Sequence, residues 1–276
     1  MGFSVYKEQR VKTERLKTFT YKNGVVNLSL RIKNKKGNLS MESIFPESNK
    51  PKPSERTPQG MIKYHRLQKW WLEKLTASER QRIRNQYSPM SDSNIDKGNY
   101  THSSSSTVKF LKEVGGWFIA KEGDRPLALK ILQEAESNIH LSTSEVDQHF
   151  LYGRMMELYY KDRKKEGYYE LAKEYALKQI DIAAATVQQM KRDHLSFIAI
   201  SSKKYKSMRH LTIENTPFHI PSHAGYRQLA IIYKKEKRWD DVIALCEQAI
   251  SEGWCGDWED RVDDALRQKL KQQAPN

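Results

Sequence analysis

The 276-residue sequence lacks the features that mark several large classes of protein. Its only cysteines, Cys246 and Cys255, form neither a C-x-x-C pair nor a framework, which excludes a disulfide-stapled scaffold and a multi-cysteine metal site. No stretch approaches the roughly 18 apolar residues of a membrane span, and the stretch MGFSVYKEQRVK lacks the apolar run of a signal peptide. These absences predict a soluble protein of the reducing cytoplasm without membrane association.

Motifs that carry catalysis are also missing. The chain contains no G-x-S-x-G or H-E-x-x-H stretch and no glycine-rich phosphate loop. His219 and His223 have the i, i+4 spacing of a zinc pair, but Pro221 lies between them and disfavours the helix that this pair would need. We therefore expect no intrinsic catalysis, no bound metal and no cofactor.

Positive charge is abundant and unevenly placed. The net charge is +14, and residues 1–100 hold 21 basic against 9 acidic residues, whereas residues 101–276 hold 27 against 25. A basic front of this kind is attracted to phosphates or to an acidic protein surface. The alternative is a solvated tail that keeps the protein in solution.

Residues 1–60 contain one local folding signal followed by a linker. Asn23-Gly24 suits a two-residue type I′ turn, and pairing outward from it sets Phe19 opposite Leu28 on an apolar face. The sequence predicts a possible β-hairpin at 18–30. From about residue 33 to residue 60 the chain is rich in Pro, Lys, Ser and Asn, a composition typical of linkers.

Residues 61–100 form a segment rich in tryptophan and arginine. Its apolar residues share one helical stripe, namely Leu67, Trp70, Trp71 and Leu75. Thr76 and Glu79 have the spacing of a capping box, which begins a second helix. That helix carries three candidate contacts to phosphate or to an acidic partner, Arg80, Arg82 and Arg84. The alternative is a buried tryptophan core with a solvated arginine rim.

The region from residue 101 to 276 shows self-similarity. At 223–256 two apolar helical stripes are separated by a short polar turn, and the small residues Ala230 and Ala249 stand where two helices approach closely. These spacings resemble a tetratricopeptide repeat. The large positions of the pattern are filled by Tyr226, Leu229 and Tyr233, and the second apolar stripe includes Trp239, Val242 and Cys246.

Two partial copies precede this repeat. In the first, a helix at about 108–121 supplies Gly116 at the small position, and Ala128 lies on its partner helix. In the second, residues 150–180, Ala172 and Ala176 take the small positions. Residues 181–221 fit no repeat, and we expect a long helix to continue to about Leu195. The resemblance predicts a mainly α protein of antiparallel helical hairpins.

The stretch EGWCGDWED, residues 252–260, is predicted to be a corner. Gly253 stands where a helix would end in a left-handed residue, and Asp257 can N-cap a final helix. That helix carries an apolar stripe from Trp258 onward, as expected of a helix that caps a repeat array.

The resemblance implies a binding function. Arrays of this type usually hold peptides or partner helices in the concave face made by the first helix of each repeat. The solvent-side residues of those helices, Arg154, Glu157, Arg227 and Lys234, are candidate partner contacts, with ordinary surface charge as the alternative.

The stretches HRLQKWW, YYKDR and GWCGDWEDR also resemble an uncharacterised bacterial group of tetratricopeptide-containing proteins. The leading hypothesis is a protein- or peptide-binding adaptor. The alternative is a nucleic-acid-binding regulator, in which the basic N-terminal region contacts DNA or RNA and the repeats sense a peptide.

Overall fold

A computed structural model describes residues 57–89, 95–101, 103, 105–140 and 143–273, together with the backbone of three strands. The strands are β1 (Arg15–Lys22), β2 (Val25–Lys33) and β3 (Leu39–Ser43), in the antiparallel order β1-β2-β3. Residues 23 and 24, and every side chain up to residue 56, lie outside the described part. The hairpin with its Asn-Gly turn and apolar face therefore stays a prediction.

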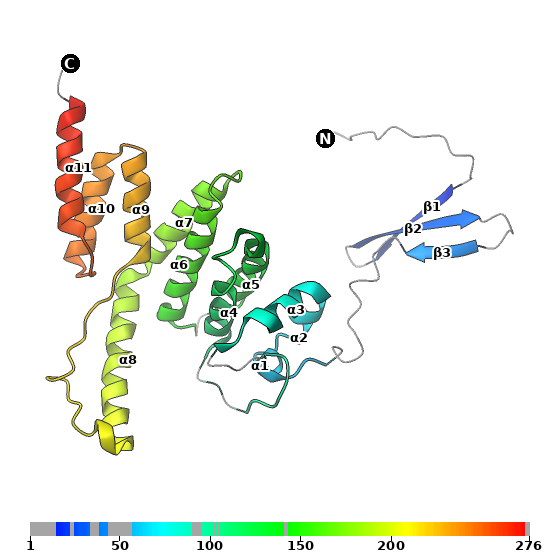
Figure 1. Cartoon of the computed structure of the whole chain (residues 1–276), viewed down its shortest axis with the longest axis horizontal. Helices are drawn as coiled ribbons and strands as arrows, with labels where there is room; N and C mark the ends of the chain where they lie inside the picture. The colour runs from blue at the N-terminus through cyan, green and yellow to red at the C-terminus, as the bar shows by residue number, and fades with distance from the viewer. Residues whose placement is uncertain are drawn as a thin grey trace.

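The elements that follow along the described chain are helices, so the protein is mainly α as expected (Figure 1). The helices are α1 (Gly60–Tyr64), α2 (Gln68–Glu73), α3 (Ala77–Gln86), α4 (Thr107–Gly116), α5 (Arg125–Ser137), α6 (Glu145–Lys161), α7 (Tyr168–Asp181), α8 (Ala183–Lys204), α9 (Ala224–Lys235), α10 (Trp239–Ser251) and α11 (Trp258–Gln273). Single 3-10 turns at Glu122–Asp124 and Lys206–Met208 precede α5 and follow α8.

Consecutive helices pack in pairs, and the pairs stack in chain order. α4 packs on α5, α6 on α7, and α9 on α10, while α11 returns along α10. The first helix of each pair also contacts the first helix of the next, since α4 touches α6 and α6 touches α9 (Figure 1). One face of the stack is therefore formed by α4, α6 and α9.

The tryptophan-rich segment belongs to the same core as the helices that follow it. The predicted stripe of α2 is buried, with Trp71 fully inaccessible to solvent, and it joins one apolar cluster with Leu111, Leu132 and Met155. Thr76 and Glu79 form the predicted capping box at the start of α3. The packing thus has no boundary at residue 100, where the sequence suggested a separate segment.

Helix α4 ends earlier than expected, at Gly116 instead of near Lys121. The adjacent Gly115 and Gly116 have low helix propensity, which favours a stop there. The close approach to the partner helix is also made by Gly115: a Cβ on it would lie 2.8 Å from Leu132 Cδ2. The prediction of Gly116 as the tightly packed small residue is therefore wrong by one position.

The long helix predicted through Ile182 is two helices. α7 ends at Asp181, Ile182 leaves the helical conformation, and α8 begins at Ala183. Helix α8 then continues to Lys204, nine residues beyond the expected end at Leu195. Its first half joins the core of α9–α11 through Ala183 and Val187.

The stretch 252–260 is a corner, as predicted. Gly253 has φ +78° and follows the last turn of α10. Its N–H donates to Ile250 O at 2.9 Å, and the N–H of Trp254 donates to Ala249 O at 3.0 Å, the two bonds of a Schellman motif. Trp254 and Trp258 are both buried, and Cys255 is exposed.

Candidate functional site

A hollow of the described surface lies where α6 and α9 meet. It has a volume of about 510 Å³, within the range of roughly 300 to 1,000 Å³ typical of ligand pockets. Lys112 of α4 borders it, and Gln179 of α7 reaches it from below. We call it the α6–α9 groove; its walls include Phe150, Arg154, Glu157 and Tyr160 of α6, and Arg227 and Gln228 of α9.

Three of the four predicted partner contacts, Arg154, Glu157 and Arg227, are brought together in this groove. Lys234 is not. It lies at the C-terminal end of α9, about 10 Å along the axis from Arg227 at 1.5 Å per residue, and its Nζ is 2.5 Å from Asp264 Oδ2 of α11. Lys234 therefore belongs to the contact between α9 and the last helix.

The border of the groove is positively charged. Lys112, Arg154, Lys161 and Arg227 line it together with one carboxylate, that of Glu157, and Lys112 also pairs with Glu113, its Nζ 3.0 Å from Oε1. Arg154 Nη1 lies 2.9 Å from Glu157 Oε2, but half of the Arg154 side chain is exposed, so water competes for this pair and the bond is weak. The groove keeps a surplus of cationic groups that attract carboxylates.

The floor of the groove is a buried amide. Gln179 is 1% exposed, and its Nε2 donates to the main-chain oxygen of His149 at 2.9 Å. Two glycines leave room for it: a Cβ on Gly153 would lie 2.8 Å from Gln179 Nε2, and one on Gly225 would lie 2.8 Å from Gln179 Oε1. Helices α6 and α9 thus approach the Gln179 amide through positions without side chains.

Several buried polar atoms in the floor or directly behind it have no hydrogen-bond partner among the residues that the structure describes. They are Gln179 Oε1, His149 Nδ1, His223 Nε2 and Gln228 Nε2. A buried polar atom left unpaired costs roughly 1 to 3 kcal/mol. Several unpaired buried polar atoms beside one hollow are unusual in ordinary packing. They are typical of a surface where a ligand supplies the missing hydrogen bonds.

Two neutral histidines and a tryptophan lie behind this floor. His149 stacks on Trp254 with ring centroids 5.7 Å apart, and His223 meets Trp254 edge-on at 4.6 Å. Burial lowers the pKa of His149 to about 4, and burial together with the neighbouring His149 lowers the pKa of His223 to about 3. Since His223 Nδ1 accepts the N–H of Tyr226, the neutral ring carries its proton on Nε2.

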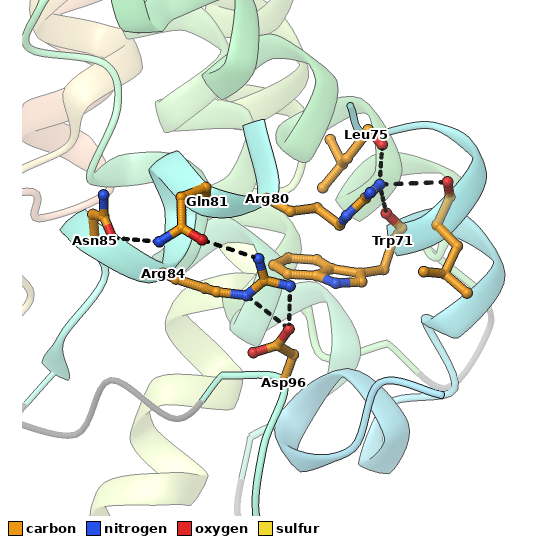
Figure 2. A network of polar contacts seen from close by, with 8 residues as sticks. Trp71, Leu75, Arg80, Gln81, Arg84, Asn85 and Asp96 are labelled. Atoms are coloured by element: carbon orange, nitrogen blue, oxygen red, sulfur yellow. Dashed lines mark hydrogen bonds and ion pairs between the residues drawn. The ribbon is translucent and has the colours of Figure 1, made fainter. Parts of the chain in front are cut away.

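The arginines of α3 lie away from this groove and are used inside the fold. Arg80 is fully buried, and its Nη1 donates to the main-chain oxygens of Trp71, Leu72 and Leu75, where α2 ends (Figure 2). A cation at the carbonyl end of a helix is favourable. The expectation that Arg80 contacts a phosphate is wrong, because Arg80 has no surface to offer.

The other two arginines are held by carboxylates. Arg84 Nη2 lies 2.6 Å from Asp96 Oδ2, with both side chains largely buried (Figure 2). Arg82 forms a two-pronged pair with Asp124, at 2.6 and 3.0 Å. Binding a phosphate at either arginine would require it to displace the carboxylate, so neither residue presents a ready anion site.

The described residues contain no group of three His, Cys, Asp or Glu side chains that could hold a metal ion. Cys246 faces the core as its helical position predicts, and burial raises the pKa of its thiol to about 11, which keeps it protonated. No described helix has the length and apolar character needed to cross a membrane.

Comparisons with known proteins give no match: no family model, no curated protein and no solved structure is similar to this chain.

Sequence patterns did not single out the residues of the groove floor. Gln179 follows Ala172 and Ala176 at the i+7 and i+3 positions of the buried stripe of α7, so a polar residue on a core face was the available signal. Gly153 and Gly225 lie within or at the start of helices, where glycine is unfavourable unless close packing needs it. His149 and Gln228 gave no such signal.

Proposed function

We propose that the protein is a protein- or peptide-binding adaptor, whose helical hairpins are of tetratricopeptide type and whose α6–α9 groove receives an extended segment of the partner. The observation that carries the proposal is the convergence of Arg154, Glu157 and Arg227 with buried, unpaired polar atoms around one hollow. A binding surface needs both a rim that attracts the partner and a floor that the partner completes.

The repeat assignment is supported by small residues at the helix contacts. Ala230 and Ala249 of the α9–α10 pair are buried, as are Ala172 and Ala176 of α7 and Gly115 of α4. Stacked pairs of this kind present their first helices on one face. The scarcity of cysteine favours a reducing compartment, and we place the adaptor in the cytoplasm of a bacterium.

A nucleic-acid-binding regulator is the second candidate, and its support is reduced. The three arginines proposed to contact phosphate are engaged in the fold. What remains is the sequence charge of residues 1–60, where 13 basic residues stand against 5 acidic ones. Salt-dependent binding of random duplex DNA by the full chain is the result that would favour this alternative.

The adaptor proposal is tested by photocrosslinking at single sites in the native cell. A benzoylphenylalanine at Phe150, which is 43% exposed in the groove, should capture a defined protein. The same probe at Phe197, which is 52% exposed on α8 outside the groove, is the matched control.

The capture at Phe150 should disappear when Arg154→Glu and Arg227→Glu are combined, because both changes reverse charges at the rim. It should persist in Lys234→Glu, because Lys234 contacts α11. Identical products from positions 150 and 197, or capture that survives the double charge reversal, would refute a role of the groove in binding.

A further inference from the structure

Gln179 and Gln228 supply the groove with one buried acceptor and one buried donor that no described residue uses. Gln179 Oε1 and Gln228 Nε2 are inaccessible to solvent and unpaired, and both residues line the hollow. We propose that these two amides hold the main chain of one residue in an extended acidic segment: Gln179 Oε1 accepts the N–H of that residue, and Gln228 Nε2 donates to its C=O. This inference rests on the proposed function and names the chemistry that the groove recognises.

The orientation of the Gln179 amide is fixed by the fold. Its Nε2 donates to His149 O, and only the nitrogen of the amide can do so. The other atom, Oε1, is therefore an acceptor and needs an N–H. Gly225 leaves room for the amide in this orientation, because a Cβ there would lie 2.8 Å from Gln179 Oε1. The same Cβ would lie 2.9 Å from Ala176 O, a main-chain atom that cannot move aside.

One residue of an extended chain is the complement of such a pair, since each non-proline residue carries one N–H donor and one C=O acceptor and both point to the same side of the chain. The groove borders α4, α6 and α9 in succession, so an extended chain fits its course better than a compact ligand. The cations Lys112, Arg154, Lys161 and Arg227 outnumber Glu157 along that course, which favours acidic side chains next to the held residue.

Unpaired polar atoms elsewhere do not make a comparable site. His65 Nε2 and Trp71 Nε1 are also buried without a partner in the described part of the chain. Neither residue lines the hollow beside α2, whose walls are formed instead by Arg66, Trp70 and Glu134 among others. Among the residues that the structure describes, the groove floor is where a donor and an acceptor of this kind border a hollow with a surplus of positive charge.

The test uses the full chain, labelled with ¹⁵N, and octapeptides with blocked ends. The parent probe is acetyl-(Glu-Ala)₄-amide, and two further probes carry N-methyl groups on all four alanines or on all four glutamates. Successive N–H groups of an extended chain point in opposite directions. One of the two methylated sets therefore removes the N–H that would face Gln179, while both keep the four carboxylates.

We expect the parent peptide to shift the side-chain amide signals of Gln179 and Gln228. One methylated peptide should bind about tenfold more weakly than the parent, and the other should lose much less, as the loss of one buried hydrogen bond predicts. Gln228→Met should weaken the parent by a similar factor, and it should weaken the methylated peptides as well, because Gln228 contacts the C=O and N-methylation leaves that group in place. Lys234→Met, also on α9 but paired with Asp264, should leave all affinities unchanged.

Equal affinity for all three peptides, unaltered by Gln228→Met, would show recognition by charge alone; the inference would then fail while the groove's role in binding would stand. No shift with any peptide at millimolar concentration would also overturn it. Preferential shifts with adenosine monophosphate, whose base also pairs a donor with an acceptor, would replace the peptide residue by a nucleobase. The crosslinking experiment decides the adaptor role separately from each of these outcomes.

Discussion

Two regions of the molecule bury polar side chains and use them differently. Around α2 and α3, Arg80 donates hydrogen bonds to main-chain carbonyls, and Arg84 forms an ion pair with Asp96 (Figure 2). In the α6–α9 groove, by contrast, Gln179 keeps one atom paired with the fold and leaves the other unpaired beside a hollow. The comparison teaches that a cationic residue in sequence can be internal structure, while a neutral amide can belong to a binding surface.

The largest expected effect is the loss of stability on substitution of Arg80. Arg80→Met keeps most of the side-chain volume but removes the donor from the carbonyls of Trp71, Leu72 and Leu75. The free energy of unfolding should fall by about 3 kcal/mol, because buried acceptors lose a charged partner. Urea denaturation measures this as a lower midpoint with an unchanged slope.

The control for this change is Arg82→Met. Arg82 is 38% exposed and pairs with Asp124 at the surface, where water and salt screen an ion pair, so this change should lower the stability much less than Arg80→Met. If both variants lost the same stability, Arg80 would not be an internal structural contact. The contrast between the two regions would then fail for the region around α2 and α3.

Local signals made some features of both regions predictable from sequence. The capping box at Thr76 and the left-handed Gly253 are set by backbone hydrogen bonds within a few residues, and both were confirmed. The burial of the α2 stripe follows from its helical spacing. By contrast, the partners of Arg82 and Lys234 lie 42 and 30 residues away along the chain, and spacing alone carries no information about them.

The groove shows the same limit. Arg154 and Glu157 share a helical face by spacing, so their common position was predictable. The floor depends on how tightly three helices approach, because Gln179 of α7 reaches the groove only through Gly153 of α6 and Gly225 of α9. Such a contact among three separate segments requires the tertiary structure.

The second prediction addresses the packing of the floor. In Gly225→Ala the new methyl would lie 2.8 Å from Gln179 Oε1 and 2.9 Å from Ala176 O, closer than carbon and oxygen tolerate. We expect a loss of about 2 kcal/mol in the free energy of unfolding, as for other overpacked sites. Urea denaturation provides the measurement.

Gly123→Ala is its matched control, since a Cβ at Gly123 meets nothing within 4 Å. This variant should unfold at the urea concentration of the parent protein or slightly higher, because alanine restricts the unfolded chain. Comparable losses in the two variants would mean that the close approach at Gly225 does not hold the floor in place.

The third prediction concerns pH and the histidines behind the floor. The pKa of His149 is about 4 in the folded protein, below its ordinary value of 6.5, because burial disfavours the charged ring. As the pH falls below 6.5, the unfolded chain gains a proton at His149 that the folded protein does not bind until about pH 4. Stability due to this group is therefore full above pH 6.5 and is lost toward pH 4, at up to about 1.4 kcal/mol per pH unit.

His149→Phe isolates this contribution, since phenylalanine keeps a ring to stack on Trp254 and has no titrating group. Unfolding free energies measured in urea from pH 7 to pH 4 should fall less steeply in the variant than in the parent. The remaining slope includes His223, whose pKa is also lowered chiefly by burial. Parallel curves for the two proteins would mean that His149 has the same pKa in the folded and the unfolded chain, and burial would then not keep its ring neutral below pH 6.5.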